Sequence, residues 1–249
     1  MNNSTKILGV IPARYNSTRL PGKVLREISG KPMIYWVYKN ALRSPLLQDL
    51  LIATDSELVL KACRDLDLPV TMTGEHPTGS DRLHEVMQRT DADIYVNIQG
   101  DEPTVRPEHI NGLLLPLLDG TEFGVSTLKV KMTPEAALSP DAVKVVTAKD
   151  GAALYFSRHP IPYHRNPDNP VQHYKHIGLY AYRREALQQF FTLSQTALEL
   201  SEMLEQLRLI ENGIRIHVGE TEFDTVGVDT ERDLNEVIAL FSNVQPSLQ

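Results

Sequence analysis

Short apolar runs alternate with helical patterns over the first half of the chain. The run at residues 6–12 ends in a proline, as expected for a strand buried on both faces of a mostly parallel sheet. The alternation that follows is the βαβ rhythm of a doubly wound α/β domain. Further strands are predicted at residues 50–53, 69–72 and 94–98, and helices at 34–42, 56–65, 80–89 and 110–118. Pro116 is expected to kink or shorten the last of these helices.

The pattern changes after Phe123. Strands are predicted there without long helices between them, and a loop that contains proline, asparagine and histidine occupies residues 159–173. We therefore predict a single domain over residues 1–249, with a β-rich insertion or dimer arm at about residues 123–183. The elements predicted in this half are strands at residues 143–146, 153–156, 177–182 and 214–218, a helix at 201–211, and a helix that follows a capping box, Thr230-x-x-Asp233.

Composition is that of a folded protein. The chain has 249 residues, of which 41% are hydrophobic and 23% charged, so it can bury a substantial core. It lacks an uncharged apolar run of about 18 residues, and residues 1–4 lack the pattern of a signal peptide, so we expect a cytoplasmic protein. Cys63 is the one cysteine, which excludes an internal disulfide. The net charge of −7 argues against nucleic acid or an anionic membrane as the main partner.

One loop is basic although the protein is acidic. Arg14, Arg19 and Lys23 follow the first predicted strand, at the edge where open α/β sheets bind their ligands. Such a loop suits the phosphates of a nucleoside triphosphate, and a solvated surface loop is the other interpretation. Residues 17–24 narrowly miss the P-loop pattern. Ser17 replaces its first glycine and Val24 replaces the hydroxyl residue that binds magnesium, which argues against an ATPase.

Two aspartates stand where a metal could bind. Asp101 follows the strand at residues 94–98, and a carboxylate there can hold Mg²⁺ or serve as a turn residue. Asp229 directly precedes a predicted helix, where capping alone could explain a carboxylate. Residues 78–80 also precede a helix, so they can bind polar ligand atoms or simply cap it.

Nine segments follow one another in a recognisable order along nearly the whole chain. They are residues 11–23, 30–34, 53–55, 79–82, 97–103, 153–158, 176–180, 204–208 and 227–230. Together they resemble the signature of bacterial 3-deoxy-manno-octulosonate (Kdo) cytidylyltransferases, nearest to the capsule-associated form. The resemblance implies a Rossmann-like, glycosyltransferase-A-like nucleotidyltransferase fold. It also implies that CMP passes from CTP to Kdo, giving CMP-Kdo and pyrophosphate for lipopolysaccharide or capsule synthesis, with Mg²⁺ as cofactor and a homodimer.

The resemblance also implies roles for individual residues. Arg14, Lys23 and Asp101 would be catalytic, and Asp101 and Asp229 would hold the metal. The acceptor sugar would contact Arg158, His176, Tyr180, Glu205 and Gln206. The nucleotide would contact Pro12, Ala13, Arg14, Arg19, Lys23, Thr73, Ser80, Arg82, Gln99 and Asp101.

Ordinary alternatives stay open for the second half of the chain. Glu205 and Arg208 could form a surface i,i+3 pair on a helix whose core residues are Met203, Leu207 and Ile210. The histidines at 159, 164, 173 and 176 match no compact zinc site. A related enzyme could use another acidic acceptor, such as an amino analogue of Kdo or a phosphonate, and a non-catalytic nucleotide-binding scaffold is the alternative of another class.

Overall fold

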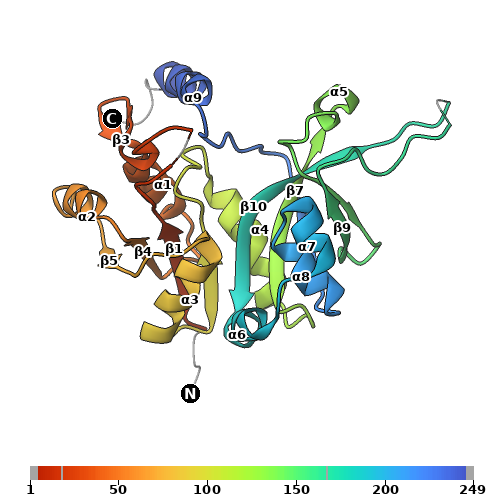
Figure 1. Ribbon diagram of the computed structural model, residues 1–249, viewed down its shortest axis with the longest axis horizontal. Coiled ribbons are helices and arrows are strands. Elements are labelled where there is room, and N and C mark those ends of the chain that lie inside the picture. Colours follow the sequence, from red (N-terminus) through yellow and green to blue (C-terminus); the bar gives the residue numbers. More distant parts are fainter. Residues whose placement is uncertain (1–4, 18, 167, 245–249) are drawn as a thin grey trace. The chain divides into compact units, whose positions relative to one another are not determined.

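The structure is a computed structural model that describes residues 5–17, 19–166 and 168–244 (Figure 1). Residues 1–4 and Thr18 of the basic loop lie outside the described part. The chain divides into two compact units, of which the first comprises Met1–Asn111 with Thr225–Gln249 and the second Gly112–Asp224. A single domain over the whole chain remains a prediction. None of the helices in the described residues is both long and apolar enough to cross a membrane.

A parallel sheet forms the centre of the first unit. β1 lies between β4 and β6, and β5 pairs with β4, which gives the order β6-β1-β4-β5. All six residues of β1 are buried, in agreement with its unbroken apolar run. The predicted strands of this region are confirmed to within one residue at each end, as β1 (Ile7–Pro12), β4 (Asp49–Thr54), β5 (Val70–Met72) and β6 (Ile94–Asn97).

The helices predicted before Phe123 are confirmed. α3 packs against three strands of the parallel sheet, and Thr78 caps it by accepting a hydrogen bond from the amide of Asp81. α4 continues through Pro116, so the expectation that this proline shortens the helix was wrong. Pro116 lies in the last turn, where the missing amide removes one hydrogen bond only. The helices are α1 (Met33–Ala41), α2 (Glu57–Arg64), α3 (Gly79–Arg89) and α4 (Pro107–Leu118).

The C-terminal helix α9 (Glu231–Val244) joins the first unit through its own small core. Leu234 and Val237 pack with Leu20 from the basic loop, and with Ile28 of the short strand β2 (Glu27–Ile28). The predicted capping box is confirmed. The Thr230 amide donates to the Asp233 carboxylate at 2.8 Å, and the Asp233 amide donates back to the Thr230 hydroxyl at 3.3 Å. Asp229 is therefore fixed at the start of α9. The 3₁₀ turn η1 (Lys23–Leu25) and strand β3 (Lys31–Pro32), which pairs with β2, had no sequence prediction.

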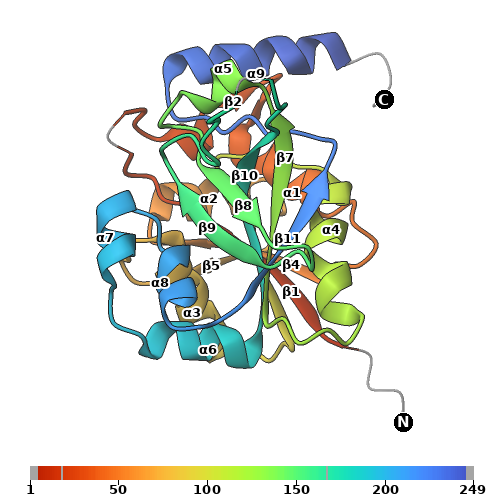
Figure 2. The ribbon, with the colours of Figure 1, turned by 90° about the vertical axis from the view of Figure 1, so that its right-hand side faces the viewer.

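The second unit contains a mixed sheet, of which strands β8 and β9 face the viewer in Figure 2. β7 lies between an antiparallel β10 and a parallel β11, while β8 pairs antiparallel with both β10 and β9. Predicted strands 143–146 and 153–156 are confirmed, whereas β10 is longer than predicted and bulges between Ile177 and Tyr180. The strands are β7 (Val125–Met132), β8 (Lys144–Thr147), β9 (Ala153–Ser157), β10 (His173–Arg183) and β11 (Ile216–Thr221).

Helices of the second unit depart from the sequence prediction. The helix predicted at residues 201–211 is broken at Met203, whose φ of 53° is left-handed, and α7 and α8 lie on either side. Met203 is 74% exposed, so its predicted place in the core was wrong, while Leu207 is fully buried. The helices of this unit are α5 (Pro134–Ala137), α6 (Arg184–Thr192), α7 (Ala197–Glu202) and α8 (Gln206–Glu211).

The packing of α9 gives a first prediction. Leu234→Ala removes a side chain that is 2% exposed and leaves a cavity in the small core. We expect a loss of about 2–4 kcal/mol in the free energy of unfolding, measured by urea denaturation. Leu240→Ala on the same helix, at a position 43% exposed, is the matched control and should cost less than about 1 kcal/mol. Equal losses in the two variants would contradict the packing described for α9.

Candidate active site

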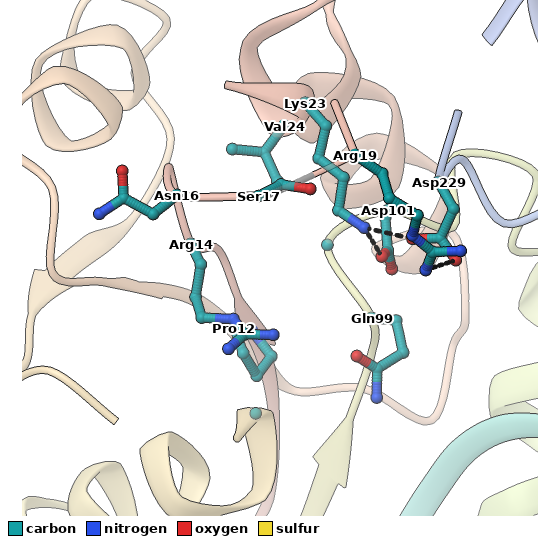
Figure 3. Close-up of a pocket in the computed structure, with 12 residues that line it drawn as sticks. Pro12, Arg14, Asn16, Ser17, Arg19, Lys23, Val24, Gln99, Asp101 and Asp229 are labelled. Atoms are coloured by element: carbon teal, nitrogen blue, oxygen red, sulfur yellow. Dashed lines mark hydrogen bonds and ion pairs between the residues drawn. The ribbon is translucent and has the colours of Figure 1, made fainter. Parts of the chain in front are cut away.

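A pocket of about 280 Å³ opens at the carboxyl ends of β1 and β6 in the first unit (Figure 3). This is the edge of a parallel sheet at which ligands bind in open α/β folds. The pocket joins segments from distant parts of the chain: the basic loop, the start of α3, the turn after β6 and the segment just before α9. Its lining residues are Pro12, Arg14, Asn16, Ser17, Arg19, Lys23, Val24, Gly79, Gln99, Gly100, Asp101 and Asp229.

Close backbone packing brings the two strand ends together. A side-chain carbon at Gly100 would lie 2.6 Å from the Pro12 carbonyl oxygen, so this position requires glycine. The Val228 amide donates to the Asp101 carbonyl at 2.9 Å, which fixes the segment before α9 against the turn after β6. Gly22, with a left-handed φ of 65°, directs the chain into η1 and so sets the position of Lys23. The backbone thereby places one lysine beside two aspartates.

The Lys23 ammonium lies between the carboxylates of Asp101 and Asp229. Its distances to their nearest oxygens are 2.5 and 2.9 Å, and Arg19 approaches Asp229 at 2.8 Å (Figure 3). The Lys23 side chain is 15% exposed. Burial lowers the pKa of Lys23, but the charges and hydrogen bonds of Asp101 and Asp229 outweigh this effect and raise the pKa above its usual value. Lys23 is therefore charged at neutral pH.

This arrangement fits a divalent cation. Two carboxylates from separate segments converge on one positive charge, and carboxylate oxygens are the ligands that Mg²⁺ prefers. Among the described residues, no group of three or more histidine, cysteine, aspartate or glutamate side chains could hold a metal. A magnesium ion at Asp101 and Asp229 would therefore need further oxygens from water or from a ligand's phosphates, which is the usual way in which proteins bind this ion.

Six residues predicted to contact a nucleotide line the pocket, and four do not. Ala13 is fully buried, and its amide donates to the Ala53 carbonyl at 2.8 Å. Thr73, Ser80 and Arg82 lie outside the pocket lining, so their contact with a nucleotide remains a prediction. The residues that the structure does place there are Pro12, Arg14, Arg19, Lys23, Gln99 and Asp101.

Arg82 is an internal anchor. Its side chain has no exposed surface, and the guanidinium donates to Asp55 at 2.6 Å, to the Gly74 carbonyl at 3.2 Å and to the Thr73 hydroxyl. The ion pair with Asp55 ties α3 to the residue after β4. Because Arg82 lies one turn inside a helix, the sequence suggested that it contacts a ligand. Nothing in the sequence indicated Asp55 as its partner.

A second cluster, in the second unit, contains predicted acceptor residues. His176 is buried, its Nε2 lies 2.9 Å from the Thr127 hydroxyl, and its ring is 5.4 Å from that of Tyr180. Burial, followed by the charge of Lys175, lowers the pKa of His176 to about 3, so the imidazole is neutral. Burial also raises the pKa of Tyr180, with smaller contributions from Tyr182 and Glu205.

The Tyr180 hydroxyl is buried without a hydrogen bond of normal geometry to any described residue. A buried hydroxyl in this state is costly unless a ligand or water completes it. Gln206, at the first position of α8, is also largely buried. The cluster therefore offers a neutral imidazole and a buried hydroxyl that lacks a hydrogen bond of normal geometry.

Arg158 follows β9 and is held by backbone carbonyls. Its Nε donates to the carbonyl of Glu202 at 2.8 Å, and its Nη1 donates to that of Pro140 at 3.1 Å. Its amide donates to the Glu202 carboxylate at 2.8 Å.

Comparison with known proteins identifies the family. A family model described as cytidylyltransferase matches residues 8–216. The 3-deoxy-manno-octulosonate cytidylyltransferase of Acidobacterium capsulatum is 53% identical over 94% of this chain and 96% of its own length. That of Koribacter versatilis is 49% identical over 94% of this chain and 89% of its own length. This chain belongs to the cytidylyltransferase family.

A solved structure extends the comparison to the fold. CMP:2-keto-3-deoxy-manno-octonic acid synthetase, complexed with CTP, superposes on this cytidylyltransferase with a TM-score of 0.93 and 44% identity. The match covers 96% of this chain and 99% of the other. A 4-diphosphocytidyl-2C-methyl-D-erythritol synthase from Anaerococcus prevotii has a TM-score of 0.64 at 13% identity, which shows a shared fold alone. The predicted Rossmann-like nucleotidyltransferase fold is thus confirmed.

Arg208 of this cytidylyltransferase does not pair with Glu205, so the surface-pair interpretation was wrong. Its Nε donates to Glu199 at 2.7 Å, and its guanidinium lies 4.8 Å from the centre of the Phe190 ring. The Glu199 side chain is only 4% exposed. Glu199 lies in α7 and Arg208 in α8, on either side of the break at Met203. One straight helix through both residues would place them far apart along its axis.

The Glu199–Arg208 pair gives a second prediction. Glu199→Gln leaves Arg208 largely buried without its countercharge, and we expect a loss of about 3 kcal/mol in the free energy of unfolding at pH 7. Glu205→Gln is the matched control on the other side of the Met203 break. It should change stability by less than about 0.5 kcal/mol.

The loss depends on pH in a defined direction. Burial raises the pKa of Glu199, but hydrogen bonds from Arg208 and the Thr196 amide outweigh it and lower the pKa below the ordinary 4.5. A lowered pKa stabilises the folded state above the unfolded pKa, and the contribution disappears as pH falls through the folded value. The difference between wild type and Glu199→Gln should therefore shrink below pH 4.5. A difference that stays constant into acid would contradict the ion pair.

Proposed function

We propose that this protein transfers CMP from CTP to Kdo, giving CMP-Kdo and pyrophosphate. The observation that carries the proposal is the convergence of Lys23, Asp101 and Asp229 in one pocket, at a sheet edge that also presents Arg14 and Arg19. Relatives at 49–53% identity with this activity in their names support it, as does the 44% identical synthetase complexed with CTP.

The cations of the basic loop would hold the triphosphate. Arg14 and Lys23 line the pocket and would neutralise the β- and γ-phosphates, with Arg19 in a weaker supporting role. The Lys23 ammonium has three N–H donors, so it can contact a phosphate oxygen of the nucleotide in place of one of its two carboxylate contacts. Positioning and charge stabilisation would carry the catalysis, because phosphoryl and nucleotidyl transfer leave little covalent work to the protein.

Asp101 and Asp229 would hold Mg²⁺, chiefly through Asp101. When bound, the ion would offset charge on the reacting phosphates and lower the pKa of the acceptor hydroxyl. Asp101 is fixed by the turn after β6, and Asp229 by the capping box of α9. These contacts fix the backbone of both residues, and the Lys23 ammonium holds their carboxylates together. The acceptor's anomeric hydroxyl would attack the α-phosphorus in line with the departing pyrophosphate.

The acceptor would bind to the cluster in the second unit. Arg158 suits the carboxylate of a sugar acid, because its planar donors match two oxygens. The neutral His176 and the unsatisfied Tyr180 hydroxyl suit sugar hydroxyls, and Glu205 and Gln206 would add further contacts. A site that hydrogen-bonds hydroxyls in this way rejects acceptors that lack them.

Kdo is favoured over other acceptors by these acceptor-site residues. An amino analogue of Kdo or a phosphonate such as phosphonoformate is the runner-up, since it would use the same nucleotide pocket. A non-catalytic scaffold is disfavoured, because no cation or carboxylate of the predicted site is replaced. We also infer that the protein acts in the cytoplasm, in the synthesis of lipopolysaccharide or capsule.

We further infer that the protein forms a homodimer through its second unit. The support is a set of exposed apolar side chains in that unit, a feature typical of protein interfaces. They are Leu138, Leu154, Tyr163, Leu198, Leu200 and Met203. A monomeric mass in solution, measured by light scattering, would refute the dimer.

Pyrophosphate release tests the activity directly. The protein is incubated with CTP, Mg²⁺ and one acceptor at a time: Kdo, its amino analogue, phosphonoformate or none. We expect the kcat/KM for pyrophosphate release with Kdo to be at least about tenfold above that with the other acceptors. This ratio corresponds to a difference of about 1.4 kcal/mol in the free energy of transition-state binding. A higher value with a phosphonate would replace the proposed acceptor, and no release with any acceptor would support the scaffold.

Asp101→Asn gives a third prediction. The amide removes the charge that would hold Mg²⁺ while preserving the shape of the side chain, so we expect kcat to fall by at least about 100-fold. The far-ultraviolet circular dichroism spectrum should be unchanged. Asp91→Asn, which alters an exposed surface pair with Lys6, is the matched control and should keep normal turnover. Near-normal turnover of Asp101→Asn would refute the metal assignment.

A further inference from the structure

Lys144, the first residue of β8, is a fully buried lysine in the second unit. Its ammonium donates to the Ser139 carbonyl at 2.8 Å and to the Arg158 carbonyl at 2.5 Å. No carboxylate of a described residue lies within ion-pair distance of it. Burial lowers its pKa, with a smaller opposing contribution from the charge of Glu202. Lysine is rarely buried in this way without a countercharge, because desolvation disfavours the charged form.

Glu202, the last residue of α7, also binds the backbone of Arg158. Its carboxylate accepts hydrogen bonds from the Ser157 hydroxyl at 2.6 Å and from the Arg158 amide at 2.8 Å. Its carbonyl accepts from the Nε of Arg158 at 2.8 Å. Burial raises the pKa of Glu202, but these hydrogen bonds outweigh it and lower the pKa, so the carboxylate is charged.

Together Lys144 and Glu202 bind both backbone groups of Arg158, its amide and its carbonyl. The amide of Arg158 is bound to the Glu202 carboxylate, and its carbonyl is bound to the Lys144 ammonium. The side chain is held by the carbonyls of Glu202 and Pro140. Few torsions of Arg158 remain free, and the guanidinium is therefore held in one place before a ligand binds.

β8 also connects this arrangement to His176. Lys144 is opposite Ser157 on β9 and opposite Lys175 on β10. The amide of His176 donates to the Val143 carbonyl, directly before Lys144, at 2.8 Å. The segment that carries Lys144 is thus bonded both to His176 and to Arg158.

We infer that Lys144 and Glu202 are positioning residues of the acceptor site, which hold the Arg158 guanidinium at a fixed place relative to His176. This inference rests on the proposed function, since it takes Arg158 as the group that binds the acceptor's carboxylate. A purely structural role would not require a charge at position 144. An apolar side chain of similar size stabilises a protein core at least as well as a buried lysine does.

Lys144→Met tests the role of Lys144. Methionine fills a similar volume but cannot donate to the Arg158 carbonyl, so Arg158 becomes mobile. We expect the KM for Kdo to rise at least about tenfold and the KM for CTP to change less than about twofold. Lys131→Met, which removes an exposed lysine from β7 of the same sheet, is the matched control and should leave both constants unchanged. Parallel increases in both constants for Lys144→Met would overturn the inference.

Arg158→Met and the double variant show whether Lys144 acts through Arg158. If it does, adding Lys144→Met to Arg158→Met should raise the KM for Kdo by less than about twofold further. Effects that multiply in the double variant would overturn the positioning role. If Arg158→Met raises the KM for Kdo and Lys144→Met does not, the positioning inference fails alone. If Arg158→Met leaves the KM for Kdo unchanged, both the positioning inference and the proposed acceptor site are refuted.

Glu202→Gln keeps the inference testable if Lys144→Met does not fold. Glutamine keeps the size of the side chain and its oxygen acceptor but removes the charge that binds the Arg158 amide. We expect the KM for Kdo to rise severalfold, with the KM for CTP unchanged within about twofold. An unchanged KM for Kdo in a folded Glu202→Gln variant would overturn the role of Glu202.

Discussion

The contact of the Lys23 ammonium with Asp101 and Asp229 is the interaction on which the first unit depends. Lys23 and Asp229 are 206 residues apart in sequence, yet their side chains meet at 2.9 Å. Two carboxylates at such close range repel each other, and a cation between them turns that repulsion into attraction. The same requirement makes the place suitable for a metal ion. The strand ends, Gly100 and the capping box of α9 all serve to bring these three side chains together.

The second unit follows a different physical principle. The cluster of predicted acceptor residues relies on burial, which keeps the His176 imidazole neutral and leaves the Tyr180 hydroxyl without a hydrogen bond of normal geometry. A largely ionic nucleotide pocket and a largely neutral acceptor cluster suit the two proposed substrates. The triphosphate carries most of the charge, and the sugar presents hydroxyl groups. Arg158 is the exception, because a sugar acid also has a carboxylate.

The sequence predicted the first unit well because two signals agreed there. Apolar runs and helical spacing marked β1, β4, β6 and the helices between them, and their order placed Arg14, Lys23 and Asp101 at one sheet edge. Six of the ten predicted nucleotide contacts therefore line the pocket. Asp229 was found from its place before a helix and from the family resemblance.

Long-range pairing explains what the sequence did not predict. The break at Met203 depends on a left-handed φ at a residue that gives no such signal, and the Glu199–Arg208 pair follows from that break. Arg82 stood where a ligand contact was expected, but its partner Asp55 is 27 residues away and is identified only in three dimensions. The same holds for Lys144, whose partners are carbonyl groups that carry no side-chain signature.

Anomalous diffraction from crystals grown with CTP and Mn²⁺ shows whether Asp101 is a metal ligand. We expect a manganese peak in the pocket, within about 2.3 Å of a carboxylate oxygen of Asp101, with phosphate oxygens of CTP among its other ligands. The Lys23 ammonium should then contact a phosphate. A nucleotide bound in the pocket with no manganese at Asp101, and with Lys23 still between the two aspartates, would refute Asp101 as a metal ligand.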